Sequence, residues 1–310
     1  MSETAVLLCG HGSRDPEAVV EFEAAAAALR ARLANLSPGA PGGPGGDFAT
    51  GYLEFARPTI GEALAALKAQ GARRIRAIPG MLFAASHVKN DLPWEMNSFM
   101  ADNPGVEVRL GRDLGIDPKL LAAAAARIAA AAPEGRSDTL LVVVGRGTND
   151  PDANSNIAKL ARMLWEGMGF GWAEAAFSGV ADPRVDAALE RSARLGFRRI
   201  VVFPYFLFTG VLVKRIYAQT DIVAARFPEI EFVKAGYLRD HDEVIGAFVD
   251  RALEFAGGDP AMNCQLCKYR TRIIGYEAAV GTPQQGHHHH VRGAGIDHHH
   301  VHDHPHTHEG

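Results

Sequence analysis

The chain has 310 residues, of which 47% are hydrophobic and 22% are charged, with a formal net charge of −4. This composition excludes wholesale disorder, and the acidic balance argues against a nucleic-acid binder. No apolar run reaches the roughly 18 residues of a membrane span, and the first residues do not resemble a signal peptide, so we expect a cytoplasmic protein without membrane contact.

The first part of the chain alternates short apolar runs with helical stretches. Strands are predicted at residues 4–9, 48–54, 74–79 and 106–110. Helices are predicted at 16–36, at 58–70 with Pro58 in the first turn, at 86–100 with a kink or restart at Pro93, and at 117–131. This alternation predicts an α/β fold with a doubly wound parallel sheet covered on both faces.

The same pattern then starts again. The segment Gly10–Pro16 returns as Gly145–Pro151 at a shift of 135, and Pro58 returns as Pro183 at a shift of 125. The difference matches a Gly- and Pro-rich insert at 37–46, which is typical of a surface loop. We therefore predict two similar halves, related by a pseudo-twofold axis, and an extension. Their predicted boundaries are 1–134, 135–257 and 258–310.

Three groups able to bind metal or accept protons occur in the first half alone. By the repeat, His11 corresponds to Arg146, Glu54 to Gly179 and His87 to Leu212. Each of the three follows or ends a predicted strand, so we expect them together at the carboxyl edge of the sheet, where ligands bind. Two imidazoles and a carboxylate suit a divalent transition metal and accept protons near neutral pH. We predict all three as catalytic and both histidines as metal ligands.

Competing catalytic motifs are missing from the sequence. It has no P-loop, Gly145-Arg146-Gly147 lacks the third glycine of a dinucleotide fingerprint, and no nucleophile elbow occurs. We therefore expect no nucleotide cofactor.

Three motifs resemble the sirohydrochlorin cobaltochelatases of the CbiX type, which are ATP-independent class II chelatases with a ferrochelatase-like fold. The motifs are Leu8–Pro16, Phe55-Ala56-x-Pro58 and Pro79–His87. The resemblance implies insertion of Co²⁺ into sirohydrochlorin, or its oxidised form, in the early-cobalt route to cobalamin. It also implies that His11 and His87 hold the metal and take up pyrrole protons, with Glu54 as a further ligand or proton acceptor.

The implied substrate carries several carboxylates, which cationic groups at the rim of the cleft are expected to bind. The candidates beside the motif loops are Arg14, Lys89, Arg146, Lys214 and Arg215. We interpret Arg146 as a substrate clamp in place of a redundant histidine. Each candidate is alternatively an ordinary solvated surface charge.

The extension contains most of the 14 histidines of the chain. We predict that they gather metal near the cleft without being needed for catalysis, the alternative being an expression tag. They are His287, His288, His289, His290, His298, His299, His300, His302, His304, His306 and His308.

Cys264 and Cys267 form a Cys-x-x-Cys motif in the extension. Together with the histidine-rich tail, this motif makes the resemblance one to the long form of the enzyme, which suggests an iron–sulfur cluster. Two cysteines are half of the usual four ligands, so a cluster would need a second chain, in a homodimer, or other ligands. A redox disulfide or a zinc site with tail histidines stays open. Cys9 is predicted to be buried packing.

Alternative functions follow from the same residues. Insertion of iron for sirohaem, or of nickel, would use the same ligands. From other classes, the chain could be a metal store or metallochaperone working through its tail, or a cluster-based redox protein. Replacement of His11 or His87 separates these functions, because a store would lose little capacity and a chelatase would lose turnover.

Overall fold

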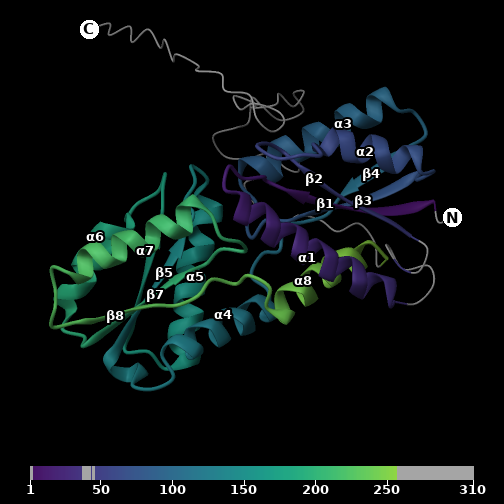
Figure 1. Ribbon diagram of the computed structural model, residues 1–310. Coiled ribbons are helices and arrows are strands. Elements are labelled where there is room, and N and C mark those ends of the chain that lie inside the picture. The colour runs from purple at the N-terminus through teal and green to yellow at the C-terminus, as the bar shows by residue number, and fades with distance from the viewer. Residues whose placement is uncertain (1–2, 37–42, 44–45, 257–310) are drawn as a thin grey trace, which may run out of the picture.

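A computed structural model describes residues 3–36, 43 and 46–256 (Figure 1). In the described part of the chain the strands form two four-stranded parallel sheets, ordered β2-β1-β3-β4 and β6-β5-β7-β8. The strands are β1 (Thr4–Gly10), β2 (Asp47–Tyr52), β3 (Arg74–Pro79), β4 (Glu107–Leu110), β5 (Thr139–Gly145), β6 (Trp172–Phe177), β7 (Arg199–Pro204) and β8 (Glu231–Lys234). The predicted α/β fold with two similar parallel-sheet halves is confirmed.

Helices cover both faces of each sheet. The α-helices are α1 (Pro16–Ala34), α2 (Ile60–Ala69), α3 (Leu92–Asp102), α4 (Pro118–Ala131), α5 (Pro151–Met168), α6 (Val185–Ser192), α7 (Val211–Ala224) and α8 (Asp242–Leu253). A π-type turn, η1 (His87–Asp91), precedes α3, and short 3₁₀ turns occur at η2 (Arg136–Asp138), η3 (Ala193–Leu195) and η4 (Glu254–Ala256). No helix among these is long and apolar enough to cross a membrane.

The leading strand β1 is buried on both faces because its side chains alternate between two cores. Val6 and Leu8 pack toward α1, whereas Leu7 and Cys9 pack toward α2 and α3. Strand β5 has the same place in the second sheet and is buried along its whole length. These apolar strands lie at the centre of each sheet and carry the motif loops at their carboxyl ends.

Helix starts follow the capping residues. The Asp15 and Asp150 side chains cap α1 and α5, each followed by a proline. The prediction that α2 begins at Pro58 is wrong. The helix begins at Ile60, because Thr59 and Glu62 form a capping box that satisfies the first free amides. The carbonyl of Pro58 instead accepts from the backbone N–H of Tyr52.

The last helix of each half lies on the other half. In Figure 1, α8 lies beside α1 on the sheet of β1–β4, and α4 lies with the sheet of β5–β8. The buried guanidinium of Arg251 on α8 donates to the carboxylate of Asp117 at 2.9 Å, and Asp117 caps α4. One hydrophobic core therefore runs through both halves. The division of the chain at residues 134 and 257 stays a prediction.

Candidate metal centre

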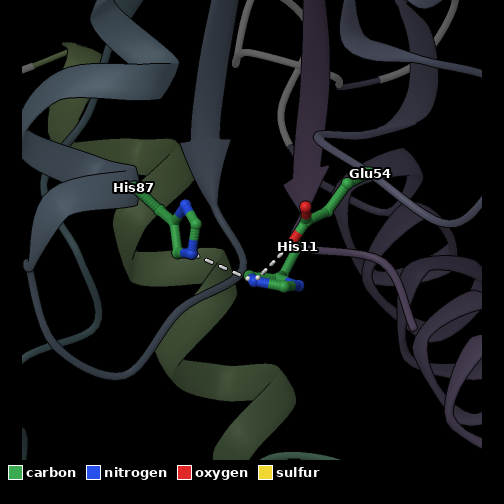
Figure 2. Close-up of side chains that lie close together, drawn as sticks. All are labelled: His11, Glu54 and His87. Carbon is green, nitrogen blue, oxygen red and sulfur yellow. Dashed lines mark hydrogen bonds and ion pairs between the residues drawn. The ribbon is translucent and has the colours of Figure 1, made fainter. Parts of the chain in front are cut away.

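Three side chains meet at the carboxyl edge of the first sheet. His11 follows β1, Glu54 follows β2, and His87 begins η1. His11 Nε2 lies 3.1 Å from Glu54 Oε1 and 3.1 Å from His87 Nε2 (Figure 2). One ligand atom from each residue lies within 4.8 Å of the other two. The structure thus brings together the three residues predicted as catalytic.

The loops after β1 and β2 are held together by their backbones. The N–H of Glu54 donates to the carbonyl of His11 at 3.0 Å, and the N–H of Leu53 donates to that of Gly10 at 3.0 Å. Gly12 has φ +90°, and a Cβ there would lie 1.6 Å from the carbonyl oxygen of Glu54. Glycine is therefore required for the close approach that places His11 beside Glu54.

The two imidazole rings are oriented by oxygens at their far nitrogens. His11 Nδ1 lies 2.9 Å from the carbonyl oxygen of Gly12, and His87 Nδ1 lies 2.7 Å from Asp91 Oδ2. When each Nδ1–H donates to its oxygen, both Nε2 atoms present lone pairs toward each other and toward Glu54. Three acceptors this close repel one another unless a proton or a metal ion lies between them.

The spacing of the Nε2 atoms matches ligands of one ion. At bonds of about 2.1 Å, two nitrogens are about 3.0 Å apart in a cis-octahedral site and about 3.4 Å apart in a tetrahedral one. The 3.1 Å between His11 and His87 lies between these values. Side-chain exposures of 30% for His11, 9% for Glu54 and 26% for His87 leave the nitrogens accessible from one side.

Sequence analysis missed Asp91, which fixes the ring of His87. Its side chain is 6% exposed and lies four residues after His87. Metal-bound histidines commonly donate their second N–H to a carboxylate in this way. The i,i+4 spacing in a predicted helix was the available signal.

A cavity of about 680 Å³ opens beside the three residues and is lined by both halves. Its volume is in the range of small-molecule and cofactor sites. Most of its wall is apolar, with His11 and His87 at one side. The large apolar contributors include Val19, Phe22, Leu82, Phe83, Phe206 and Phe208.

Two of the five predicted substrate-binding cations line this cavity. The guanidinium of Arg14 stacks 4.7 Å from the ring centroid of Phe55. Arg146 is accessible from the cavity, and among the described residues its side chain has no ion-pair partner. The surrounding protein desolvates Arg146 and lowers its pKa, which the negative charge of Glu54 opposes. A cation without a direct ion-pair partner at an apolar cavity suits an anionic ligand group.

The other three cations do not line the cavity. The buried ammonium of Lys89 binds Asp150 at 2.5 Å and Asp152 at 3.2 Å and lies outside the cavity lining. Lys214 binds Asp15 and Glu17, each at 2.8 Å. Arg215 is exposed outside the cavity lining. The structure therefore does not place these three residues in the cavity wall.

Cys9 is buried in β1, and burial raises the pKa of its thiol, which confirms its interpretation as core packing. The predicted metal ligands of the extension, Cys264, Cys267 and the eleven histidines from His287 to His308, lie outside the described residues. The iron–sulfur, zinc, disulfide and metal-gathering hypotheses for them stay predictions.

The sequence pattern of the CbiX family matches residues 5–131 and 140–255. Sirohydrochlorin cobaltochelatase of Priestia megaterium is 34% identical over 273 residues, covering 87% of this chain and 86% of that protein. Sirohydrochlorin ferrochelatase of the same organism is 30% identical over 191 residues, covering 62% of this chain and 71% of that protein.

The chain is also similar in fold to SirB of Bacillus subtilis, solved with Fe³⁺. The TM-score is 0.71 at 26% identity, over 83% of this chain and 99% of SirB. SirB from the subspecies spizizenii, described as a sirohydrochlorin chelatase in complex with cobalt, gives a TM-score of 0.67 at 25% identity over the same shares. Similar proteins thus carry iron and cobalt in one fold.

Proposed function

The chain belongs to the CbiX family, and on that premise we propose that it is a sirohydrochlorin chelatase that inserts Co²⁺ without nucleotide hydrolysis. The observation that carries the proposal is the convergence of His11, Glu54 and His87 on one point at the wall of a cavity of about 680 Å³. Relatives named as sirohydrochlorin chelatases support the substrate.

The metal ion enters as a substrate of the reaction. Neutral imidazoles bind a first-row divalent ion without the tight hold of thiolates, so the ion can be passed on to the macrocycle. His11 and His87 each present Nε2 while Gly12 and Asp91 hold the opposite ring nitrogen. Glu54 adds a negative charge that offsets the dehydration of the ion.

Metal insertion must also remove two pyrrole protons as the dication enters. The same groups accept these protons once the ion has left them. His87 gains a proton at Nε2 while the carboxylate of Asp91 stabilises the imidazolium, and Glu54 or His11 takes the second proton. The macrocycle lies on the apolar wall, and Arg14 and Arg146 bind its peripheral carboxylates.

Cobalt is proposed as the metal because the cobaltochelatase relative matches 87% of the chain at 34% identity. Iron is the competing metal, favoured by the ferrochelatase relative and by the Fe³⁺ in SirB. Imidazole and carboxylate ligands accept both ions, so the ligand set does not choose between them.

The test is an anaerobic absorbance assay with sirohydrochlorin and Co²⁺, Fe²⁺ or Ni²⁺, without ATP. We expect the fastest metallation with Co²⁺, and a loss of at least about 100-fold in kcat/KM in His11→Ala and His87→Ala, because each removes a ligand and proton acceptor. A faster reaction with Fe²⁺ would reassign the metal.

The control variant is His241→Asn. His241 caps α8 away from the cavity, and asparagine also serves as an N-cap, so turnover should be unchanged. No acceleration over the uncatalysed reaction with any metal, while the chain still binds many Co²⁺ ions, would contradict the proposal and favour a metal store.

A further inference from the structure

Two equivalent lysines tie the halves of the molecule together. At the repeat shift of 125, Lys89 corresponds to Lys214, and at the shift of 135 their partners also correspond. Lys89 of the first half binds Asp150 and Asp152 of the second half, and Lys214 of the second half binds Asp15 and Glu17 of the first. The structure therefore contains a reciprocal pair of ion-pair bridges.

The two bridges differ in their surroundings. The side chain of Lys89 is 7% exposed, whereas that of Lys214 is 53% exposed. A buried charge pair is fixed in geometry, because breaking it leaves an uncompensated charge, while an exposed pair is worth little. The Lys89 bridge is thus the rigid one of the two.

The rigid bridge starts in the segment that carries a metal ligand. Lys89 lies in η1, two residues after His87 and two before Asp91. Its neighbours Val88, Asn90 and Asp91 are buried as well, so the segment is packed into the protein on both sides of Lys89. At the equivalent place in the second half, Lys214 lies two residues after Leu212, which is not a metal ligand.

The bridge ends on a fixed point of the second half. Asp150 uses one oxygen, Oδ1, to accept from the N–H of Asp152 as the cap of α5, and the other, Oδ2, to bind Lys89. Asp152 is in the first turn of the same helix. A helix start held by its own cap does not shift easily, so it anchors η1 from the second half.

We propose that Lys89 is a positioning residue through which the second half, itself without metal ligands at the equivalent positions, holds η1 so that His87 Nε2 faces His11 and Glu54. This inference rests on the proposed chelatase function for its kinetic consequence. Its structural part stands on the contacts of Lys89 alone. Within the first half, the backbone N–H of Lys89 donates to the carbonyl of Ala85 at 2.8 Å.

The test compares Lys89→Met with Lys214→Met in the full chain, because methionine keeps the apolar stem and removes the charge. We expect Lys89→Met to raise the KM for Co²⁺ about tenfold while the KM for sirohydrochlorin stays within twofold, as for removal of an outer partner of a metal ligand. Lys89→Arg should restore most of the loss. Lys214→Met should leave both constants within twofold.

Hydrogen–deuterium exchange on the same metal-free proteins measures directly how firmly η1 is held. Amides of residues 87–92 should exchange at least about fivefold faster in Lys89→Met than in wild type. In Lys214→Met their exchange rates should be unchanged. If Lys89→Met does not fold, Asp152→Asn serves instead, since it removes the longer of the two ion pairs and leaves the cap intact, with a smaller effect in the same direction.

Unchanged exchange in this segment, or an unchanged KM for Co²⁺ in a folded Lys89 variant, overturns the inference. An equal effect of Lys214→Met overturns it too, because the bridges would then act only through general stability. If wild-type protein fails to metallate sirohydrochlorin, the proposed function fails, and the exchange result still decides whether Lys89 holds η1.

Discussion

The turn after the leading strand reads Gly10-His11-Gly12 in the first half and Gly145-Arg146-Gly147 in the second. A Cβ on Gly12 would lie 1.6 Å from the carbonyl oxygen of Glu54, and one on Gly147 would lie 1.8 Å from that of Gly179. Both backbones therefore require glycine at this place. The residue between the glycines lines the cavity and differs between the halves. The glycines are therefore required by the backbone, whereas the residue between them is set by what the cavity binds.

Other shared features also belong to the backbone. Phe55 and the equivalent Val180 both have a positive φ, of 59° and 62°. Asp117 and His241 cap the equivalent helices α4 and α8. Among the described residues, in contrast, the candidate metal-ligand group His11, Glu54 and His87 lies in the first half. The first half thus carries the candidate metal ligands, while the second supplies cavity wall, Arg146 and the partners of Lys89 in η1.

The largest effect is expected from alanine at the shared glycines. Gly12→Ala and Gly147→Ala should each lower the free energy of unfolding by about 3 kcal/mol, since both combine a positive φ with a backbone clash. Only Gly12→Ala should also abolish metallation at temperatures where both variants are folded. Urea denaturation and the metallation assay measure the two effects.

Gly61→Ala is the matched control, because a Cβ at this helical glycine meets no atom within 4 Å. It should be stabilising by about 0.5 to 1 kcal/mol. Equal loss of metallation in Gly12→Ala and Gly147→Ala would contradict the conclusion that the candidate metal ligands lie in the first half alone among the described residues.

A smaller effect is expected where the halves hold the same loop differently. In the first half the buried carboxyl of Asp113 accepts from the N–H of Ala84 at 3.0 Å. The equivalent loop of the second half is held from the first half, where Glu21 of α1 accepts from the N–H of Thr209 and from the hydroxyl of Tyr237. The first arrangement puts a buried carboxyl within its own half.

Burial raises the pKa of Asp113 to about 6, against the hydrogen bond from Ala84 and the charges of Arg112 and Arg251. In the unfolded chain the pKa is about 3.9, so the native state binds more protons between these values, and stability falls as pH rises through this window. Asp113→Asn should make the fall in the free energy of unfolding across this window smaller by about 2 kcal/mol.

Urea denaturation at pH 4.5 and 7.5 measures the prediction as a difference between wild type and variant, which cancels the other carboxylates. Tyr237→Phe is the control in the second half and should keep the wild-type dependence, since its hydroxyl does not titrate in this range. A variant curve parallel to that of wild type would show that Asp113 does not bind a proton more tightly in the native state.

The smallest effect is expected at the position that differs between the halves. Arg146→Ala should raise the KM for sirohydrochlorin about tenfold with kcat within threefold, because a guanidinium–carboxylate pair formed equally in the ground and transition states strengthens binding alone. Arg146→Lys should recover part of the affinity. Arg215→Ala, which removes an exposed cation outside the cavity, is the control. A fall in kcat with unchanged KM would instead place Arg146 in the chemical step.

Local patterns predicted much of this molecule. Apolar runs at strand spacing, the caps Asp15 and Asp150, and the repeat of glycine and proline indicated the two sheets. The difference between His11 and Arg146 indicates which half carries the candidate metal ligands. Pro58 misplaces the predicted start of α2, because the capping box of Thr59 and Glu62 starts the helix two residues later.

Contacts between the halves were beyond the reach of these patterns. The chain alone does not say that α8 packs on the first sheet, or that Lys89 meets Asp150 and lies outside the cavity lining. Strand period, helix caps and glycine turns arise from interactions within a few residues, so the sequence by itself determined the fold and the three candidate ligands. Which charges are paired, and which remain free to bind a ligand, depends on packing between segments more than 60 residues apart, such as Lys89 and Asp150, and only the tertiary structure decided it.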